Sequence, residues 1–451
     1  MSGKDLRSYL ESIKKTYPDE FVVVTREIDP GFEITALVAR LEQQRKWPVL
    51  LFENVKGTSF PVLTNLHARR QRLALALQSE PRRMVPTYLE RLNHPVAAKE
   101  ISGGPVMEVI KTGGDINLLD LPQIIHHSLD AGPYVTGAIA MAKDPKTGRV
   151  NASYNRLMIK GKDKLGIHLT EGKHLWDYYK TAEAMGKPLE VAFVIGNHPC
   201  WGLGSLHIHS GDETEIDVIN CLMQAPLEMT ACHSIDLKVP AHAEMVIEGE
   251  IPPEVREDEG PFGEFTGYSL GMRPREVVKI NAICHRKDAI FHDISVGHLD
   301  HLLLSTIPME ANLLRAVRAA VPSVAGVRIP APFMAFVAIE KRLEGQGMNA
   351  ILAAFGAEMY LKNVVVVDHD INIYDNHQVL WAISTRTQPD RDLVTMANTR
   401  GSDLDPSCTV DGLTSKMGID ATAKPSLAEF TPRHAFPEGI LERMDPEKYL
   451  P

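Results

Sequence analysis

The most informative segment for the fold is LKVPAHAEMVIEGEI, residues 237–251, which is followed by EVVKINAICHR at 276–286. Both are rich in β-branched and apolar residues and are bounded by turn-forming or charged residues, as is typical of strands. The run KDPKTG at 143–148 predicts a hairpin turn. Similar short runs begin after Gly103, so we expect the middle third to form an antiparallel β-barrel. These runs are YVTGAIAMAKDP (134–145), ASYNRLMIKG (152–161), LEVAFVIG (189–196) and SLHIHSG (205–211).

The segments on either side of this region mix helical and strand patterns. Apolar residues recur at helical spacing from Leu6 and from Ile34, with the strand-like run FVVV (21–24) between them. One amphipathic helix, at about 174–186, is expected to interrupt the barrel. We predict a mixed α/β (α+β) multidomain fold. Its domains would be an N-terminal α/β domain at 1–104, a barrel domain at 105–304 and a C-terminal α/β domain at 305–451.

The C-terminal third has a pattern of its own. After about residue 305 helical and strand runs alternate, which predicts a parallel sheet with crossover helices. The tail from about 400 is polar and rich in Gly, Pro, Ser and Asp. We expect this tail to be a loop or to wrap a partner.

Composition and charge exclude several classes of protein. Of the 451 residues, 44% are hydrophobic and 24% charged, as in ordinary soluble globular proteins. The 48 Lys and Arg are outnumbered by 58 Asp and Glu, so we expect no nucleic-acid partner. No apolar run approaches the roughly 18 residues of a membrane-spanning helix, and we expect no membrane association. The five cysteines are scattered without a CxxC pair, which indicates a reducing, cytoplasmic compartment.

The run EDEGPFGEFTGY, residues 257–268, contains a suggestive pair of carboxylates. Glu259 and Glu264 are five residues apart on a segment broken by Gly and Pro, so the backbone can turn and point both to one place. Two carboxylates in one pocket raise the pKa of one of them, which yields a neutral acid near pH 7. The same composition is common in acidic surface turns, and composition alone favours that interpretation.

A second candidate is the pair Asn151 and Arg156 in NASYNRLMI (151–159). At this spacing in an extended strand the two side chains lie on opposite faces unless a bulge intervenes. An inward-facing Arg156 would bind a carboxylate through its planar guanidinium. A surface ion pair on an edge strand explains the residue equally well.

Potential metal ligands crowd the middle third without a diagnostic spacing. No HExxH or similar motif selects any histidine, so a hydrogen-bonded core or surface role is the default. Glu213, Glu215 and Asp217 in GDETEID (211–217) have the pattern of a solvated acidic run. A site combining Asn, His and Glu would suit Mn²⁺ or Mg²⁺ better than zinc. The histidines are His168, His174, His198, His207, His209, His233 and His242.

The order of these motifs resembles that of the UbiD-like family of decarboxylases, which use prenylated FMN. The resemblance includes an N-x4-R element, a histidine that opens a helix, a metal-binding glutamate ahead of a VPAxxE strand, and the acidic turn. It continues through the late chain and so covers most of the sequence. The matching residues are Asn151 and Arg156, His174 in GKHLWDYYKTAEAMGK (172–187), Glu215 ahead of VPAHAE (239–244), EDEGPFGEFTGY (257–268) and YLKNVVVVDHDINIYDNHQVLWAISTRTQPDRD (360–392).

The resemblance implies a central split β-barrel of the FMN-binding type and a last domain that mediates assembly into a homodimer or homohexamer. Asn151, His174 and Glu215 would hold Mn²⁺ or Mg²⁺ beside the phosphate of prenylated FMN. Ser205 would contact a nearby K⁺, and Lys173 would be a further cofactor-binding residue. A flavin prenyltransferase would supply the cofactor.

The resemblance also implies the catalytic residues. Arg156, Glu259 and Glu264 would form the Glu-Arg-Glu network of the family, with Arg156 over the cofactor and the substrate carboxylate. Glu264 would supply the proton that replaces CO₂. Loss of CO₂ from an sp² carbon leaves an anion that needs an electron-accepting cofactor, so the protein supplies positioning and one proton.

The predicted function is reversible, non-oxidative decarboxylation of an aromatic, heteroaromatic or α,β-unsaturated carboxylic acid. Furan, pyrrole and hydroxybenzoate acids are the candidate substrates. The pocket wall is expected in VGHLDHLLLSTIPM (296–309), unless this segment is a loop facing solvent or a partner. If His298, Asp300 and His301 line the pocket, they favour a substrate with a second polar group.

Two other functions stay open when the resemblance is set aside. One is a flavin-independent, metal-assisted hydrolase that uses Glu259 or Glu264 as its base. The other is a non-catalytic flavin-binding subunit.

Overall fold

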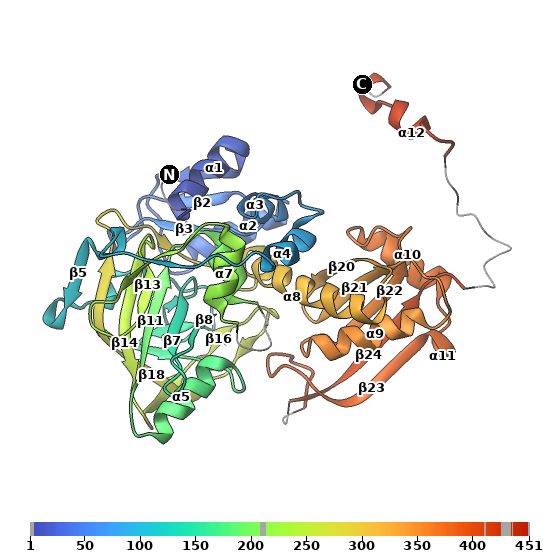
Figure 1. Ribbon diagram of the computed structural model, residues 1–451. Coiled ribbons are helices and arrows are strands. Elements are labelled where there is room, and N and C mark those ends of the chain that lie inside the picture. The colour runs from blue at the N-terminus through green and yellow to red at the C-terminus, as the bar shows by residue number, and fades with distance from the viewer. Residues whose placement is uncertain (1–3, 208–212, 410–411, 425–433, 435, 450–451) are drawn as a thin grey trace.

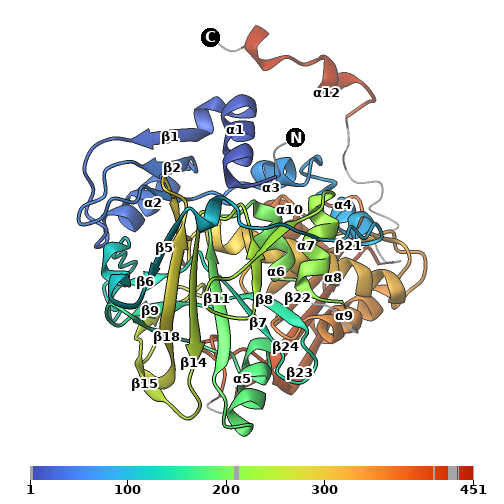
Figure 2. The same cartoon turned by 60° about the vertical axis from the view of Figure 1, so that its left-hand side comes forward.

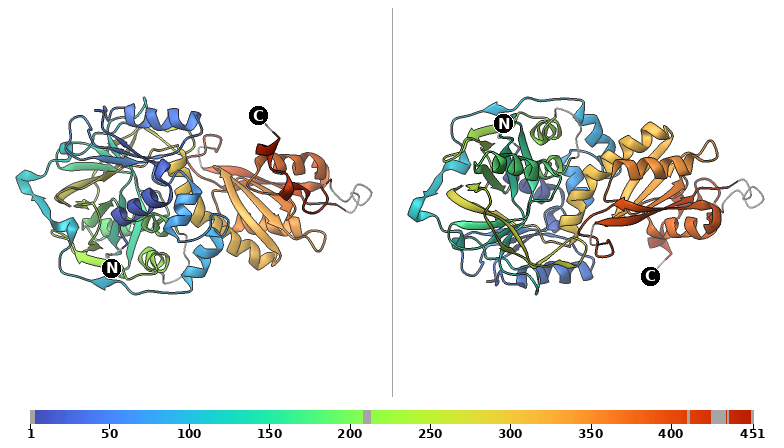
Figure 3. Two further views of the ribbon diagram at one scale, coloured as in Figure 1. Left: turned by 90° about the horizontal axis from the view of Figure 1, so that it is seen from above. Right: turned by 90° about the horizontal axis from the view of Figure 1, so that it is seen from below.

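A computed structural model describes residues 4–207, 213–409, 412–424, 434 and 436–449. The N-terminal and central parts of the chain form one large body, and the last third forms a smaller one (Figure 1). The long helix α8 (Leu299–Ala320) leads from the first body to the second. Views from above and below show the same division (Figure 3). The predicted mixed α/β multidomain architecture is confirmed. No helix among the described residues is long and apolar enough to cross a membrane.

The N-terminal layer is a four-stranded sheet in the order β1-β2-β3-β19. The helical spacing from Leu6 predicts α1 correctly, because Leu6, Leu10 and Ile13 pack against Val49 of the sheet. Strand β19 comes from beyond the central region and pairs with β3 in parallel. The strands are β1 (Phe21–Val24), β2 (Val49–Phe52), β3 (Val62–Thr64) and β19 (Phe291–His292). The helices are α1 (Leu6–Thr16), α2 (Glu33–Gln43), α3 (Arg70–Ala76) and α4 (Met84–Leu92).

The central region is a ten-stranded sheet whose strand pairs are antiparallel. The path is β6-β9-β10-β18-β14-β11-β7-β8, and β15 and β5 pair with β18 as well. Strands β18, β14 and β11 run side by side in Figure 2. The strands are β5 (Val109–Thr112), β6 (Tyr134–Val135), β7 (Ile139–Lys143), β8 (Val150–Tyr154), β9 (Leu157–Ile159), β10 (Lys164–Ile167), β11 (Leu189–Ile195), β14 (Met245–Ile251), β15 (Arg256–Glu259) and β18 (Arg273–His285).

The sheet is apolar on both faces because it separates two hydrophobic cores. On β11, Val194 belongs to one core while its neighbour Phe193 belongs to the other, and Val246 and Ile247 alternate in the same way on β14. Burial on both sides explains why these strands are continuous apolar runs. The predicted hairpin over KDPKTG is confirmed, because Lys143 pairs with Val150 across it. Two small sheets flank the large one: β4 (Lys99–Glu100), β12 (Glu228–Ala231) and β13 (Lys238–Pro240), then β16 (Phe262–Gly263) and β17 (Ser269–Leu270).

More than the one predicted helix interrupts the central region. The expected helix is α5 (His174–Ala184), but α6 (Pro199–Ser205) and α7 (Glu215–Met223) also lie there. The predicted strand SLHIHSG is wrong at its start, because Ser205 is the last residue of α6. A Pro at the first position and a cap from His198 start that helix, and these local signals outweigh the β-prone residues that follow. Residues 208–212 lie outside the described residues.

The C-terminal body is a five-stranded sheet in the order β20-β21-β22-β24-β23. Pairing is parallel among β21, β22 and β24, as predicted, but antiparallel at both edges. The expectation of a loop after residue 400 is wrong for Leu413–Ala421, which forms β24, a strand between β22 and β23. The elements are β20 (Val324–Ala331), β21 (Met334–Ile339), α9 (Gln346–Ala357), β22 (Asn363–Asp368), α10 (Asn376–Arg386), α11 (Pro389–Asp392), β23 (Leu393–Arg400), β24 (Leu413–Ala421) and α12 (Ile440–Arg443).

Candidate active site

The turn between β15 and β16 brings two glutamates onto one arginine. Gly260 has φ +87°, a conformation that glycine adopts without strain, and it reverses the chain just after Glu259. Arg156 Nε and Nη2 donate to the two carboxylate oxygens of Glu259 at 2.9 and 2.8 Å. Arg156 Nη1 donates to Glu264. The three residues of the expected Glu-Arg-Glu network are therefore in direct contact.

Burial sets the electrostatics of this network. The side chains of Arg156 and Glu264 are 8% and 11% exposed. Burial alone would lower the pKa of Arg156, but the hydrogen bonds that it donates to Glu259 and the charge of Glu264 outweigh burial and raise the pKa. Burial raises the pKa of Glu264 above its ordinary value, although Arg156 acts in the opposite direction. Glu264 therefore keeps a proton to higher pH than a solvated glutamate, as a proton donor requires.

Two aromatic residues that the sequence did not point to complete this network. Tyr134 donates its hydroxyl to Glu259 Oε1 at 3.0 Å. The Phe262 ring lies 5.2 Å from the Arg156 guanidinium carbon, and its centroid is 4.2 Å from that of Tyr134. Tyr134 opens the first strand-like run of the predicted barrel, but no spacing relates it to Glu259. Only the pairing of β6 with β9, which places Tyr134 opposite Met158, brings it here.

Asn151 and Arg156 belong to different parts of the candidate site. Asn151 lies within β8, whereas Arg156 follows the end of that strand at Tyr154. The alternation rule for a single strand therefore does not relate the two side chains. Arg156 joins the acidic turn, and Asn151 joins a second cluster.

The second cluster is formed by Asn151, His174 and Glu215. His174 is the first residue of α5, and Glu215 is the first residue of α7 after the N-cap Thr214. Asn151 Nδ2 donates to Glu215 Oε1 at 3.0 Å, and His174 Nδ1 lies 3.3 Å from the same oxygen. Glu215 is only 5% exposed, so the expectation of a solvated acidic run is wrong for this residue.

This donor set fits a hard or borderline divalent cation. An amide oxygen, an imidazole and a carboxylate on rigid elements suit Mn²⁺ or Mg²⁺. In the described part of the chain, no metal-like group is built from three His, Cys, Asp or Glu side chains. A cation held by Asn151, His174 and Glu215 would therefore depend on the Asn151 amide as one of its ligands.

Ser205 and Lys173, the other expected cofactor contacts, have different surroundings. The Ser205 hydroxyl is buried and has no hydrogen-bond partner among the described residues. Such a hydroxyl fits an additional ligand, because buried polar groups are normally hydrogen-bonded. Lys173 is exposed, and its ammonium lies 5.2 Å from the Tyr360 ring of the C-terminal body. Lys173 therefore contacts the C-terminal body beside the cluster.

The sequence predicts that the segment 296–309 is either a pocket wall or a loop. It is mostly helical, because α8 begins at Leu299. Asp300 is fully buried and accepts from the backbone N–H groups of Asn65 and His67 at 3.1 and 2.6 Å. Asp300 thus anchors the N-terminal segment to α8 through two buried hydrogen bonds. The His301 ring lies 6.1 Å from that of Phe265, next to Glu264. The His298 ring instead lies 2.7 Å from Glu42 of α2.

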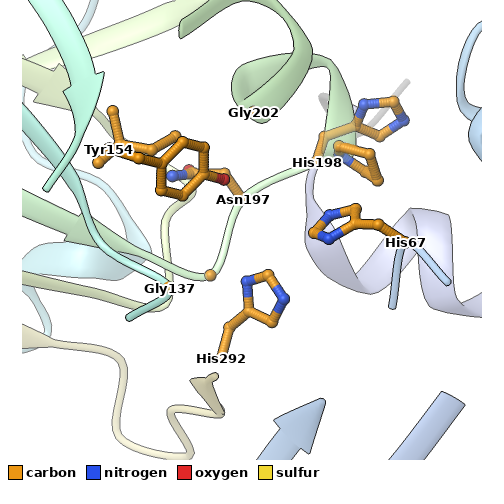
Figure 4. A pocket seen from close by; sticks show the side chains of 10 residues that line it. His67, Gly137, Tyr154, Asn197, His198, Gly202 and His292 are labelled. Atoms are coloured by element: carbon orange, nitrogen blue, oxygen red, sulfur yellow. The ribbon is translucent and has the colours of Figure 1, made fainter. Parts of the chain in front are cut away.

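A separate, small polar cavity is lined by residues of the N-terminal and central parts of the chain (Figure 4). His67, His198 and His292 line it together with Asn197 and Tyr154. Burial lowers the pKa of His292 to about 4 and that of His198 to about 3, so both rings are neutral at pH 7. These histidines have the buried core role that is the default for histidines in the sequence.

Comparison with known families shows three matches that follow one another along the chain. They are the N-terminal, Rift-related and C-terminal domains of 3-octaprenyl-4-hydroxybenzoate carboxy-lyase, at residues 15–92, 99–299 and 303–421. An anhydromevalonate phosphate decarboxylase from Methanothermobacter thermautotrophicus is 34% identical over 428 residues. The match covers 94% of this chain and 98% of that enzyme.

Solved structures give the same result. The UbiD-class enzyme HmfF from Pelotomaculum thermopropionicum in complex with FMN has a TM-score of 0.93 at 40% identity, over 99% of this chain and 100% of that one. An evolved dimeric form of HmfF in complex with prFMN has a TM-score of 0.89 at 38% identity, over 99% of this chain and 100% of that one. The 3,4-dihydroxybenzoic acid decarboxylase AroY from Klebsiella pneumoniae has a TM-score of 0.89 at 28% identity, over 99% of each chain. The chain therefore belongs to the UbiD family of decarboxylases.

Proposed function

We propose that the protein releases CO₂ reversibly from an aromatic, heteroaromatic or α,β-unsaturated acid, with prenylated FMN as its cofactor. The observation that carries this proposal is the contact of one buried arginine with two glutamates, of which Glu264 has a raised pKa. A metal-assisted hydrolase needs no such arginine, and the family match supports the decarboxylase. The intact network also argues against a non-catalytic subunit.

The cofactor would be held beside the Asn151, His174 and Glu215 cluster. A divalent cation there, Mn²⁺ or Mg²⁺, would offset the phosphate charge that an acidic protein otherwise repels. The orphaned hydroxyl of Ser205 fits a phosphate oxygen or a K⁺ ion. When bound, prenylated FMN would supply the electron sink for the charge that CO₂ loss leaves behind.

Arg156 would orient the substrate carboxylate. Glu259 and Tyr134 fix the guanidinium from one side, so Nη1 keeps a defined direction. Nη1 is bonded to Glu264 here, and a substrate carboxylate would compete with Glu264 for it. Loss of the Arg156 contact would raise the pKa of Glu264 further and favour its protonated form. Glu264 would then donate its proton to the carbon from which CO₂ has left.

The substrate class is drawn from the relatives and from the surroundings of Glu264. One relative is named for anhydromevalonate phosphate and one structural neighbour for 3,4-dihydroxybenzoic acid. Burial lowers the pKa of His301 to about 4, so near Phe265 it would offer a neutral ring to a second polar group of the substrate. Furan, pyrrole and hydroxybenzoate acids fit this description.

Assembly and supply of the cofactor complete the proposal. We expect a homodimer or homohexamer built through the C-terminal body, and one structural neighbour is a dimeric form. A flavin prenyltransferase would provide the cofactor, and we expect both proteins to act in the cytoplasm.

The test is to express the chain with a flavin prenyltransferase and to record the absorption spectrum and mass of the bound cofactor. A panel of furan, pyrrole, hydroxybenzoate and α,β-unsaturated acids is then assayed for CO₂ release. Bound prenylated FMN and release from one class of acid would support the proposal. A protein that binds no flavin, or that hydrolyses substrates with added metal alone, would contradict it.

A further inference from the structure

A groove separate from the candidate active site lies where three parts of the chain meet. Its volume is about 430 Å³, within the range of small-molecule pockets. Leu299 and Leu303 of α8 form one wall, and they lie one helical turn apart on one side of that helix. His301, which contacts Phe265 beside Glu264, lies between them in sequence and projects from a different side of the helix. The groove and the acidic turn therefore lie on different sides of α8.

The groove has positive charge that its own lining does not neutralise. Arg69, Arg70 and Arg82 line it, and no acidic residue does. Glu20 pairs with Arg69 at 2.7 Å but is shared with the buried Arg72. Arg82 is exposed and makes no ion pair or side-chain hydrogen bond within the described ranges. In a chain with a net charge of -10, this is a local site for an anion.

Hydrogen-bond donors without acceptors point to the same kind of ligand. Trp47 Nε1 and Arg70 Nε belong to lining residues, are buried, and have no hydrogen-bond partner among the residues described. The two other nitrogens of the Arg70 guanidinium bind Glu310 at 3.1 and 2.8 Å, which holds the arginine in place. An acceptor-only group, such as phosphate or carboxylate, is the partner that these donors lack.

The rest of the lining is apolar or aromatic. Ala68, Pro81 and the two leucines supply aliphatic surface, and Trp47 and Tyr374 supply rings. The Arg70 guanidinium carbon lies 5.4 Å from the Tyr374 ring. We propose that this groove binds a small anionic molecule with an apolar or aromatic body and a phosphate or carboxylate head. Because the N-terminal layer, α8 and the C-terminal body all line it, the bound molecule would stabilise their arrangement.

Phenyl phosphate is a suitable probe, with phenol and inorganic phosphate as its two halves. We expect saturable binding of phenyl phosphate in calorimetry, a change in tryptophan fluorescence, and a higher melting temperature. Phenol and inorganic phosphate should each bind at least tenfold more weakly. Arg82→Gln should weaken the binding of phenyl phosphate about tenfold at low salt. Trp47→Phe removes only the N–H donor and part of the ring, and it should weaken this binding several-fold.

Two controls separate this groove from other sites. Arg83→Gln removes an adjacent exposed arginine that pairs with Glu90 and does not line the groove, so binding should be unchanged. Arg156→Ala should also leave binding unchanged. Loss of binding in Arg156→Ala with full binding in Arg82→Gln would place the probe in the candidate active site and overturn the proposal. No saturable binding, or equal binding of inorganic phosphate, would overturn it as well.

Discussion

Glu259 and Glu264 share one arginine but have different surroundings. Glu259 accepts two hydrogen bonds from Arg156 and one from Tyr134, so both of its carboxylate oxygens are engaged. Glu264 contacts Arg156 through a single oxygen, and burial raises its pKa. We therefore expect Glu259 to orient the arginine and Glu264 to be the group that exchanges a proton.

Replacing Glu264 tests this division of roles. Glu264→Gln should lower the rate of CO₂ release by at least about 100-fold, because general acid catalysis contributes on that order. Cofactor content, read from the flavin absorbance, should stay unchanged. Glu257→Gln alters a nearby glutamate, in β15, that pairs with Lys160 and Lys164 at 3.0 and 2.6 Å, and it should retain activity. Wild-type turnover in Glu264→Gln would show that another group supplies the proton.

The raised pKa of Glu264 predicts the pH dependence. Only the protonated form can donate, so the rate should be highest below the pKa in the folded protein and fall as pH rises through it. That alkaline limb should lie above the ordinary glutamate value of 4.5. A pH profile of kcat measures it, and a limb that persists unchanged in Glu264→Asp and Glu264→Gln would belong to a different residue.

Asp300 is a buried residue whose role is structural. Burial alone would raise its pKa, but the hydrogen bond and charge of His67 outweigh burial and lower it below 3.8. Asp300→Asn should lower the free energy of unfolding by about 3 kcal/mol at pH 7, because it leaves buried donors without a charged acceptor. Urea denaturation measures this, with the exposed Asp163→Asn as the neutral control.

The same contact predicts how that difference changes with pH. A depressed pKa contributes stability that is present above the unfolded value of 3.8 and is lost as pH falls through the folded value. The difference in the free energy of unfolding between the wild type and Asp300→Asn should therefore become smaller below pH 4. A difference that stays constant down to pH 2 would show that charge is not the cause.

At the scale of elements, the packing of α9 on β24 shows why the tail is not a loop. Gly418 in β24 leaves room for Ile351 of α9, since a Cβ at this position would lie 2.3 Å from the Ile351 side chain. Val365 and Ile419 pair directly across β22 and β24. The polar and Gly-rich composition of the tail does not predict this strand. A small residue such as Gly418 is needed there because α9 packs closely on β24.

This packing predicts opposite effects for two glycines. Gly418→Ala should destabilise the protein by about 1–3 kcal/mol, because the added methyl forces α9 away from the sheet. Gly356→Ala, on an exposed part of α9 with nothing within 4 Å, should stabilise it by up to about 1 kcal/mol. Chemical denaturation of both variants measures the two effects, and a neutral Gly418→Ala would mean that α9 is free to move.

At the scale of the whole molecule, the metal-like cluster depends on three segments that are far apart in sequence. Asn151, His174 and Glu215 lie on β8, α5 and α7. Strand β8 and helix α7 pack in one hydrophobic core of the central body, and α5 packs in the other. The cluster thus forms only when the central body is complete.

Removing one ligand should affect the metal and the cofactor together. Glu215→Ala should lower bound Mn²⁺ and prenylated FMN by similar factors, because in the proposed site the cation would offset the phosphate charge. Metal analysis and flavin absorbance of the purified protein measure both. Glu213→Ala changes an exposed neighbour outside the cluster and should have little effect. Full flavin occupancy in Glu215→Ala would contradict the assignment of this cluster.

The sequence by itself determined what local pattern and residue type can encode. Apolar spacing predicted α1 and α2, the turn residues predicted the β7–β8 hairpin, and the glycines of 257–268 predicted a tight turn. It also supplied the members of the two clusters, because their residue types and order resemble a known family. These features depend on residues close together in the chain or on motifs preserved as short strings.

The tertiary structure decided everything that depends on distant segments meeting. It placed Tyr134 on Glu259, buried Glu215 and Asp300, and paired β19 with β3 across more than 200 residues. It also made β24 a strand, and began α8 at Leu299, where the sequence allowed loops. Strand pairing and burial arise from contacts between segments, and neither composition nor periodicity within one segment contains that information.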